Sequence, residues 1–236
     1  ILLFFKCDIF DPYDKEENPP ENYPKELYPL SKSKLQELRS ELDTMKNTSY
    51  EILINQYGLS DHKGTLSRGS SSIGNKDSVI VNAKVAVTKF SNFTNVKDTS
   101  NLIVACATND HGTNLYNDWI VTFQNQIYDN IEVLDTKIMV LITDNIIQIL
   151  GHHYNEINIP HNNKISSEKA KANVIGSELI YCGFSDKDTL VVEKNMLSND
   201  NSTEDSKMII LPNEVEDVLE LRVCWKIPIF LYGRVP

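Results

Sequence analysis

The stretch that decides the predicted fold lies in the middle of the chain, at Asn101–Thr143, and reads NLIVACATNDHGTNLYNDWIVTFQNQIYDNIEVLDTKIMVLIT. Leu102–Ala107 and Lys137–Thr143 are almost wholly apolar, which is typical of strands buried on both faces. Between these runs, apolar residues recur at the four-residue spacing of one helix face: Leu115, Trp119, Phe123 and Ile127. Asn114 stands where an N-cap is expected. Strand, helix and strand in this order predict a βαβ unit with two parallel strands.

Further elements are predicted on both sides of this unit. Three segments have helical periodicity or caps, namely Ser33–Lys46, Ser166–Leu179 and Glu214–Cys224, and Ile146–Leu150 is expected to form a helical turn. Five segments are expected as strands: Tyr50–Tyr57, Ser78–Phe90, Ile180–Phe184, Leu190–Glu193 and Lys226–Tyr232. The whole pattern predicts one α/β domain over residues 1–236, three-layer-like, with a mostly parallel central sheet flanked by helices.

Three segments are predicted to be flexible. Residues 11–29 hold five prolines among acidic residues, which excludes a regular helix or a central strand. Residues 61–77 are rich in glycine and serine, but they lack the Gly-Lys-Ser/Thr ending of a phosphate-binding loop. Residues 198–206 are acidic and of low complexity. All three are therefore interpreted as exposed connections.

Charge and composition exclude several classes of protein. The chain has 236 residues and a formal net charge of −10, from 33 acidic and 23 basic residues. No apolar run reaches the roughly 18 residues of a membrane helix, and no basic cluster is present that could bind phosphate. We therefore expect neither nucleic acid nor a membrane as a partner. The four cysteines form no CxxC pair and no signal peptide is recognised, so a cytoplasmic or nuclear location is expected.

The candidates for metal binding and catalysis are few. His152, His153 and His161 lie near Glu156, but adjacent histidines point apart, so a solvated loop is predicted there. Cys106 precedes the polar run that contains Asp110 and His111, yet its apolar neighbours favour a packed, unreactive thiol.

Acidic residues flank the second apolar run of the central stretch: Glu132, Asp135 and Asp144. They lack the spacing of a catalytic pair, and we interpret them as turn residues. No catalytic, cofactor or metal residue is assigned, no cofactor is expected, and the chain is predicted not to be an enzyme. The alternative is a small-molecule enzyme of the open α/β class, acting at the strand ends near Asp110, His111 and Asp144. A scaffold subunit of another complex is a third possibility.

The C-terminal stretch resembles a known family. Its residues Trp225–Pro228, with Leu231 and Tyr232, match the late helix-strand segment of the proteasome assembly chaperone 1 family. Tyr116, Trp119 and Phe123, followed by the Ile138–Thr143 run, are similar to that family's central helix and strand, with the tryptophan one residue further on.

The resemblance implies a non-catalytic α/β chaperone without a cofactor. Such a protein forms a heterodimer with a proteasome assembly chaperone 2-like subunit and binds the α subunits of the 20S proteasome during assembly. Members of the family end in a hydrophobic–Tyr–any-residue tail, whereas this sequence ends Arg234-Val235-Pro236. No tail residue is therefore carried over, and the partner interface is not assigned.

Overall fold

The computed structural model describes residues 23–45, 50–62, 75–109, 118–143, 146–159, 165–182, 187–197 and 205–229. The chain divides into two compact units. The larger unit contains Leu27–Ile157 and Glu214–Leu219, and the smaller contains Ile1–Glu26, Asn158–Asn213 and Glu220–Pro236. Most of each segment predicted to be flexible lies outside the described residues, namely 11–22, 63–74 and 198–204. No helix in the described part is long and apolar enough to cross a membrane.

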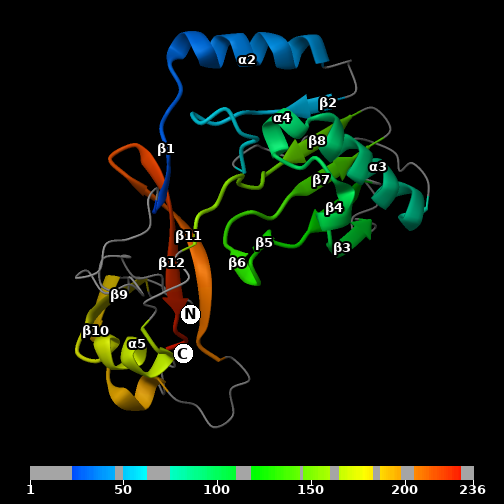
Figure 1. Cartoon of the computed structure of the whole chain (residues 1–236). Coiled ribbons are helices and arrows are strands. Elements are labelled where there is room, and N and C mark those ends of the chain that lie inside the picture. The colour runs from blue at the N-terminus through cyan, green and yellow to red at the C-terminus, as the bar shows by residue number, and fades with distance from the viewer. Residues whose placement is uncertain are drawn as a thin grey trace. The chain divides into compact units, whose positions relative to one another are not determined.

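The larger unit is built on a five-stranded sheet (Figure 1). Its strands lie in the order β2 (Tyr50–Ile52), β8 (Ile147–Leu150), β7 (Met139–Ile142), β4 (Trp119–Phe123) and β3 (Val104–Asn109). β2 runs parallel to β8, whereas β8, β7, β4 and β3 pair antiparallel in succession. The prediction of a three-layer domain with a mostly parallel central sheet is therefore wrong. The fold is mixed α/β with mostly antiparallel sheets.

The helix predicted between the two apolar runs is also wrong where the structure describes it. Trp119–Phe123 is β4, which pairs with β3 on one side and β7 on the other, so no crossover connects parallel strands. After β4 the chain forms a hairpin of β5 (Ile127–Tyr128) and β6 (Ile131–Val133). Its turn residues Asp129 and Asn130 both have positive φ, at 48° and 62°, as a two-residue hairpin turn of this kind requires. The expected N-cap Asn114 lies outside the described residues.

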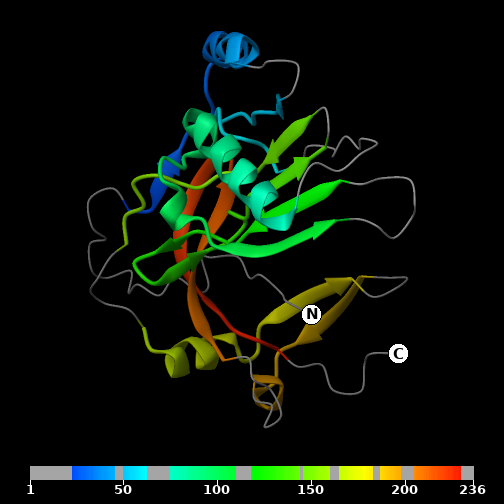
Figure 2. The same ribbon diagram turned by 90° about the vertical axis from the view of Figure 1, so that its right-hand side faces the viewer.

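Helix α3 (Lys76–Lys89) packs against β3, β4, β7 and β8 (Figure 2). This segment was predicted to be a strand because its valines alternate with other residues. The structure corrects that prediction: Asn75 caps the helix by accepting a hydrogen bond from the Ser78 amide. The residues of α3 that are buried are Val79, Ala83, Ala86 and Val87, which have helical spacing. They join the core of the larger unit together with Phe90 and Phe93.

The remaining elements of the larger unit frame this core. Helix α2 (Lys32–Met45) confirms the prediction for that segment, and its Leu42 is buried in the core cluster. The short helices α4 (Ser91–Thr94) and η1 (Thr99–Asn101) then lead from α3 into β3. The helical turn predicted for Ile146–Leu150 is wrong, because Ile147–Leu150 is β8, a strand with neighbours on both sides.

β12 (Val218–Lys226) lies between β1 (Lys25–Leu27) and β11 (Lys207–Val215), and most residues of these strands belong to the smaller unit. The helix predicted for Glu214–Cys224 is wrong, because Glu216 and Asp217 have positive φ and connect two strands. Leu219, Leu221 and Val223 of β12 are buried in alternation, as a strand with one buried face requires, and Cys224 near its end is buried as well.

Helix α5 (Ser167–Val174) confirms the first part of the helix predicted there, and Ser166 caps it. β9 (Glu178–Cys182) and β10 (Lys187–Val191) form an antiparallel hairpin, and η2 (Lys194–Leu197) follows. One core cluster of this unit contains Ala170, Val174, Leu190, Val192, Leu197, Ile227 and Ile229. The indole nitrogen of Trp225 donates to the Ile165 carbonyl at 3.2 Å and fixes the end of β12 beside α5.

Candidate functional site

The residues considered for catalysis in the sequence do not come together in the described structure. Asp110, His111, Asp144 and His161 lie outside the described residues. Cys106 is an exposed free thiol in β3, so the prediction of a packed cysteine is wrong.

Asp135 is exposed in a turn, as predicted. The interpretation of Glu132 as a turn residue is wrong, because it lies in strand β6, where its carboxylate accepts a hydrogen bond from the Asn125 side chain at 2.7 Å. No group of three or more His, Cys, Asp or Glu side chains among the described residues is arranged to hold a metal ion.

His152 and His153 are buried, with 2% and 6% of their surface exposed, so the prediction of a solvated loop is wrong. The two side chains have different surroundings. The Nδ1–H of His152 donates to the Ser60 carbonyl at 2.7 Å, and its ring packs against those of His62 and Tyr154, with centroids 5.0 and 4.9 Å away. The His153 side chain instead lines a pocket on the larger unit.

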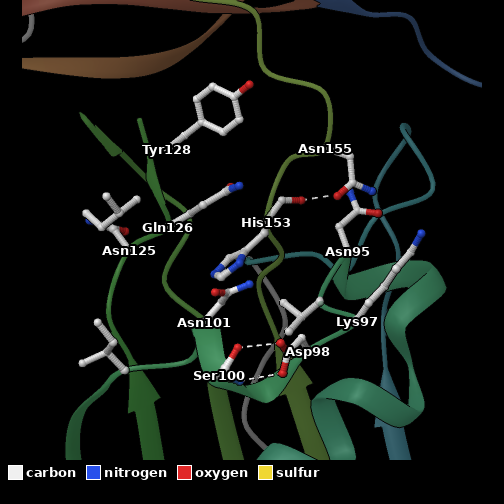
Figure 3. Close-up of a pocket in the computed structure, with 13 residues that line it drawn as sticks. Asn95, Lys97, Asp98, Ser100, Asn101, Asn125, Gln126, Tyr128, His153 and Asn155 are labelled. Atoms are coloured by element: carbon white, nitrogen blue, oxygen red, sulfur yellow. Dashed lines mark hydrogen bonds between the residues drawn. The ribbon is translucent and has the colours of Figure 1, made fainter. Parts of the chain in front are cut away.

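This pocket has a volume of about 510 Å³, which is within the ~300–1,000 Å³ typical of ligand sites (Figure 3). Three parts of the chain form it: the stretch from the turn after α4 through η1 to Ile103, the segment after β4 together with β5, and the segment after β8. Carboxamides are its most frequent side chains: Asn95, Asn101, Asn125, Gln126 and Asn155. We call it the amide pocket.

Three of these carboxamides hold the walls of the pocket in place. The side chain of Gln126 both donates to the Tyr154 carbonyl and accepts from the Tyr154 amide, each at 2.8 Å. Asn95 donates to the His153 carbonyl at 2.9 Å. Asn125 accepts from the Thr136 amide at 3.2 Å, so its oxygen is also engaged. Asn95 and Gln126 therefore bond the segment after β8 to the other two segments of the pocket wall.

Three other polar side chains of the lining have polar atoms without a hydrogen-bond partner in the described part of the chain. The Nε2 atom of His153 is buried and has no hydrogen-bond partner within the described structure. Burial lowers the pKa of His153 to about 4, so the ring is neutral near pH 7. Asn101 and Asn155 are exposed, and their side chains form no hydrogen bond with the described part of the chain. Each offers both a donor and an acceptor.

The charged groups of the pocket are at its margin. Asp98 accepts hydrogen bonds from the side chain and the amide of Ser100, at 2.5 and 2.9 Å, and these bonds lower its pKa. Lys97 is exposed, and its side chain extends away from the middle of the group of labelled residues in Figure 3. One positive and one negative side chain leave the lining without a net charge.

Apolar side chains surround the same pocket. Ile103 and Ile127 are each 56% exposed, and Tyr128 is 36% exposed. They are three of the ten large apolar side chains that are exposed in the described part of the chain. A local concentration of exposed apolar groups next to polar ones marks a surface that contacts another molecule.

Strand β3 begins directly after Ile103 and extends the site along the sheet. It is the last strand in the order of the sheet, so among the described strands only β4 pairs with it. Ala105, Cys106 and Thr108 are exposed on it. The pairing with β4 is irregular between Val104 and Cys106, where the strand is bulged. An edge strand of six residues exposes a row of backbone donors and acceptors to a partner chain.

Sequence reasoning did not identify the amide pocket. Its side chains come from three segments spread over about 60 residues, 95–103, 125–128 and 153–155, and no motif connects them. The sequence offers one signal, the frequent Asn and Gln residues at positions 95–101 and 125–126. Asn is common in the turns of every fold, so this signal does not by itself indicate a pocket.

Comparisons with known proteins give no relative: no protein family model, no curated protein and no solved structure matches the chain.

Proposed function

We propose that this chain is a non-catalytic binding protein that holds an extended segment of a partner polypeptide along the edge of β3 that no described strand occupies. The observation that carries this proposal is the position of the edge strand, which leads directly from the exposed apolar side chains around the amide pocket. Strand addition uses the main-chain groups of an edge for affinity and neighbouring pockets for specificity. β3 and the amide pocket supply these two parts.

The chemistry of the amide pocket supports binding rather than turnover. A nucleophile needs a base within hydrogen-bond distance, and a general acid or base needs a pKa near the working pH. The pKa of His153 is far below 7, and Asp98 is engaged by Ser100. The lining therefore contains hydrogen-bonding groups but no pair of side chains suited to move a proton.

The partner suggested by the sequence resemblance is a subunit of the 20S proteasome during its assembly. On this proposal the chain forms a heterodimer with a proteasome assembly chaperone 2-like subunit and contacts α subunits. Support comes from the residues Trp225–Pro228. The two helices expected in the matching segments are the strands β4 and β12, so the resemblance rests on residue identities alone.

The test is purification of the protein from native extract, followed by size-exclusion chromatography and mass spectrometry. Lysine substitutions at exposed positions of the edge, Ala105→Lys and Thr108→Lys, should remove the bound partner, because charged side chains block pairing at an edge. The matched control is Val81→Lys, an exposed position on α3, which should retain the partner.

The outcomes distinguish the binding of a segment at β3 from the role in proteasome assembly. A related subunit and proteasome α subunits in the complex would support the assembly-chaperone role. A different partner that is lost in the edge variants would support strand binding but contradict that role. A lone wild-type monomer, or a partner bound equally by all variants, would contradict the function at β3.

A further inference from the structure

We infer that the amide pocket selects an uncharged carboxamide side chain, Asn or Gln, from the segment that β3 holds. This inference rests on the proposed function and names the feature by which the partner segment would be recognised. It is carried by the buried, unpartnered Nε2 atom of His153 and by the free carboxamides of Asn101 and Asn155.

His153 is a fixed recognition group because both of its main-chain polar atoms are bonded. Its amide donates to the Thr94 carbonyl at 2.9 Å, and its carbonyl accepts from Asn95 at 2.9 Å. The ring is neutral, so one of its nitrogens donates and the other accepts. A carboxamide has an oxygen that accepts and an NH₂ group that donates, so it can satisfy Nε2 in either tautomer of the ring.

Asn101 and Asn155 also pair best with a group that both donates and accepts hydrogen bonds, and they line other parts of the pocket than His153. Asn101 is the last residue of η1, and Asn155 follows the segment that Gln126 holds. Both side chains lack partners within the described structure. Two carboxamides pair through complementary hydrogen bonds, whereas a carboxylate accepts only and an ammonium donates only.

A charged side chain would be disfavoured in this lining. It would exchange water for neutral amides and a neutral imidazole, and the charges of Asp98 and Lys97 are exposed at the margin of the pocket, where water screens them. An aliphatic side chain would leave Nε2 of His153 without a partner. The pocket therefore selects against acidic, basic and apolar residues for different reasons.

The probes for the test are four fluorescein-labelled peptides of alternating Thr and Val, blocked at both ends, with Gln, Glu, Lys or Leu at the central position. Binding to the full chain is measured by fluorescence anisotropy near neutral pH, and the site is located by amide NMR shifts of Ala105–Thr108. We expect the Gln peptide to bind about tenfold more tightly than the others, as for a site with unpaired buried polar groups.

Variants of the pocket identify the groups that are responsible. His153→Phe keeps a flat ring without polar atoms and should reduce the preference for Gln to about twofold or less. The double variant Asn101→Ala with Asn155→Ala should do the same, and it tests the inference even if His153→Phe does not fold. Asn82→Ala removes an exposed carboxamide from α3 and is the matched control, with no expected effect.

Each result has a defined meaning. Equal affinities of the four peptides, with shifts in β3, would overturn the selectivity and leave the proposed function standing. No peptide binding and no shift in β3 would overturn both. Binding of a chito-oligosaccharide probe, lost in His153→Phe while no peptide binds, would assign the pocket to a glycan and overturn the inference. Preference for Gln that survives in the pocket variants would also overturn it.

Discussion

Acidification is expected to destabilise the larger unit, because it contains three histidines that burial keeps neutral. Burial lowers the pKa values of His152 and His153 to about 4, and it lowers that of His62 as well. For His152 the bond to Ser60 and the charge of Asp61 oppose this effect, while the neighbouring His62 and His153 add to it. In the unfolded chain each ring has its ordinary pKa of about 6.5.

The sign follows from proton binding. Between about pH 6.5 and pH 4 the unfolded chain binds more protons than the folded one, so the free energy of unfolding falls as the pH falls. Stability is fully present above about pH 6.5. With folded pKa values of about 4, each of His152 and His153 removes about 2–3 kcal/mol by pH ~4.5, or about 5 kcal/mol together. This is a large part of the roughly 5–15 kcal/mol of a typical domain.

The assay is urea unfolding at a series of pH values, followed by the methyl NMR signals of Val121 and Val140, which are buried in the sheet of the larger unit. The variant His153→Phe should lose about half as much stability over the same pH range as the wild type. A free energy of unfolding that stays constant from about pH 7 to pH 4.5, or an unchanged slope in His153→Phe, would refute the reasoning.

Four further substitutions, three in the larger unit and Gly176→Ala in the smaller, test hydrogen bonds and backbone conformation. Thr136→Val should cost about 1–3 kcal/mol of unfolding free energy in urea, because the buried hydroxyl accepts from the Gln126 amide and donates to the Val133 carbonyl. Gly151→Ala should lower the melting temperature far more than Gly176→Ala: both have positive φ, but only at Gly151 would a Cβ meet a backbone atom, 2.3 Å from the Lys137 oxygen. Asn130→Gly should stabilise by up to about 1 kcal/mol, because glycine adopts the positive φ of this turn without strain.

The two segments that were predicted to be helices but form strands β4 and β12 were misassigned for the same physical reason. Residues four apart share a face of a helix, but four is also a multiple of two, so they share a face of a strand as well. Trp119 and Phe123 satisfied both patterns, and the deciding residue was Val121, which is buried between them in β4. In β12 the alternation of Leu219, Leu221 and Val223 carried the same information.

For helix α3 the error is the opposite one, because a segment that forms a helix was predicted to be a strand. Its valines have a high strand propensity and alternate over Val81–Val87, yet tertiary packing overrides this preference. The cap formed by Asn75 and the burial of Val79, Ala83, Ala86 and Val87 were the signals for a helix. Helix α2 was predicted correctly because its leucines recur at both three- and four-residue spacing, which no strand satisfies.

The candidate site could not be predicted because tertiary structure alone assembles it. The hydrogen bonds of Asn95 to His153 and of Gln126 to Tyr154 connect segments separated by 58 and 28 residues. The sequence neighbours of His153 indicate a polar loop, yet its side chain is buried, two residues after Gly151, where a side chain would not fit.

A buried polar atom without a partner costs roughly 1–3 kcal/mol, so folding alone does not favour His153 at this position. An aromatic ring such as Phe would fill the same space without that cost. A histidine at position 153 is explained if its Nε2 atom obtains a hydrogen bond from a bound segment. His153→Phe should therefore make the free protein as stable or more stable near neutral pH while weakening its complex, and a variant that loses stability instead would assign the ring to the core.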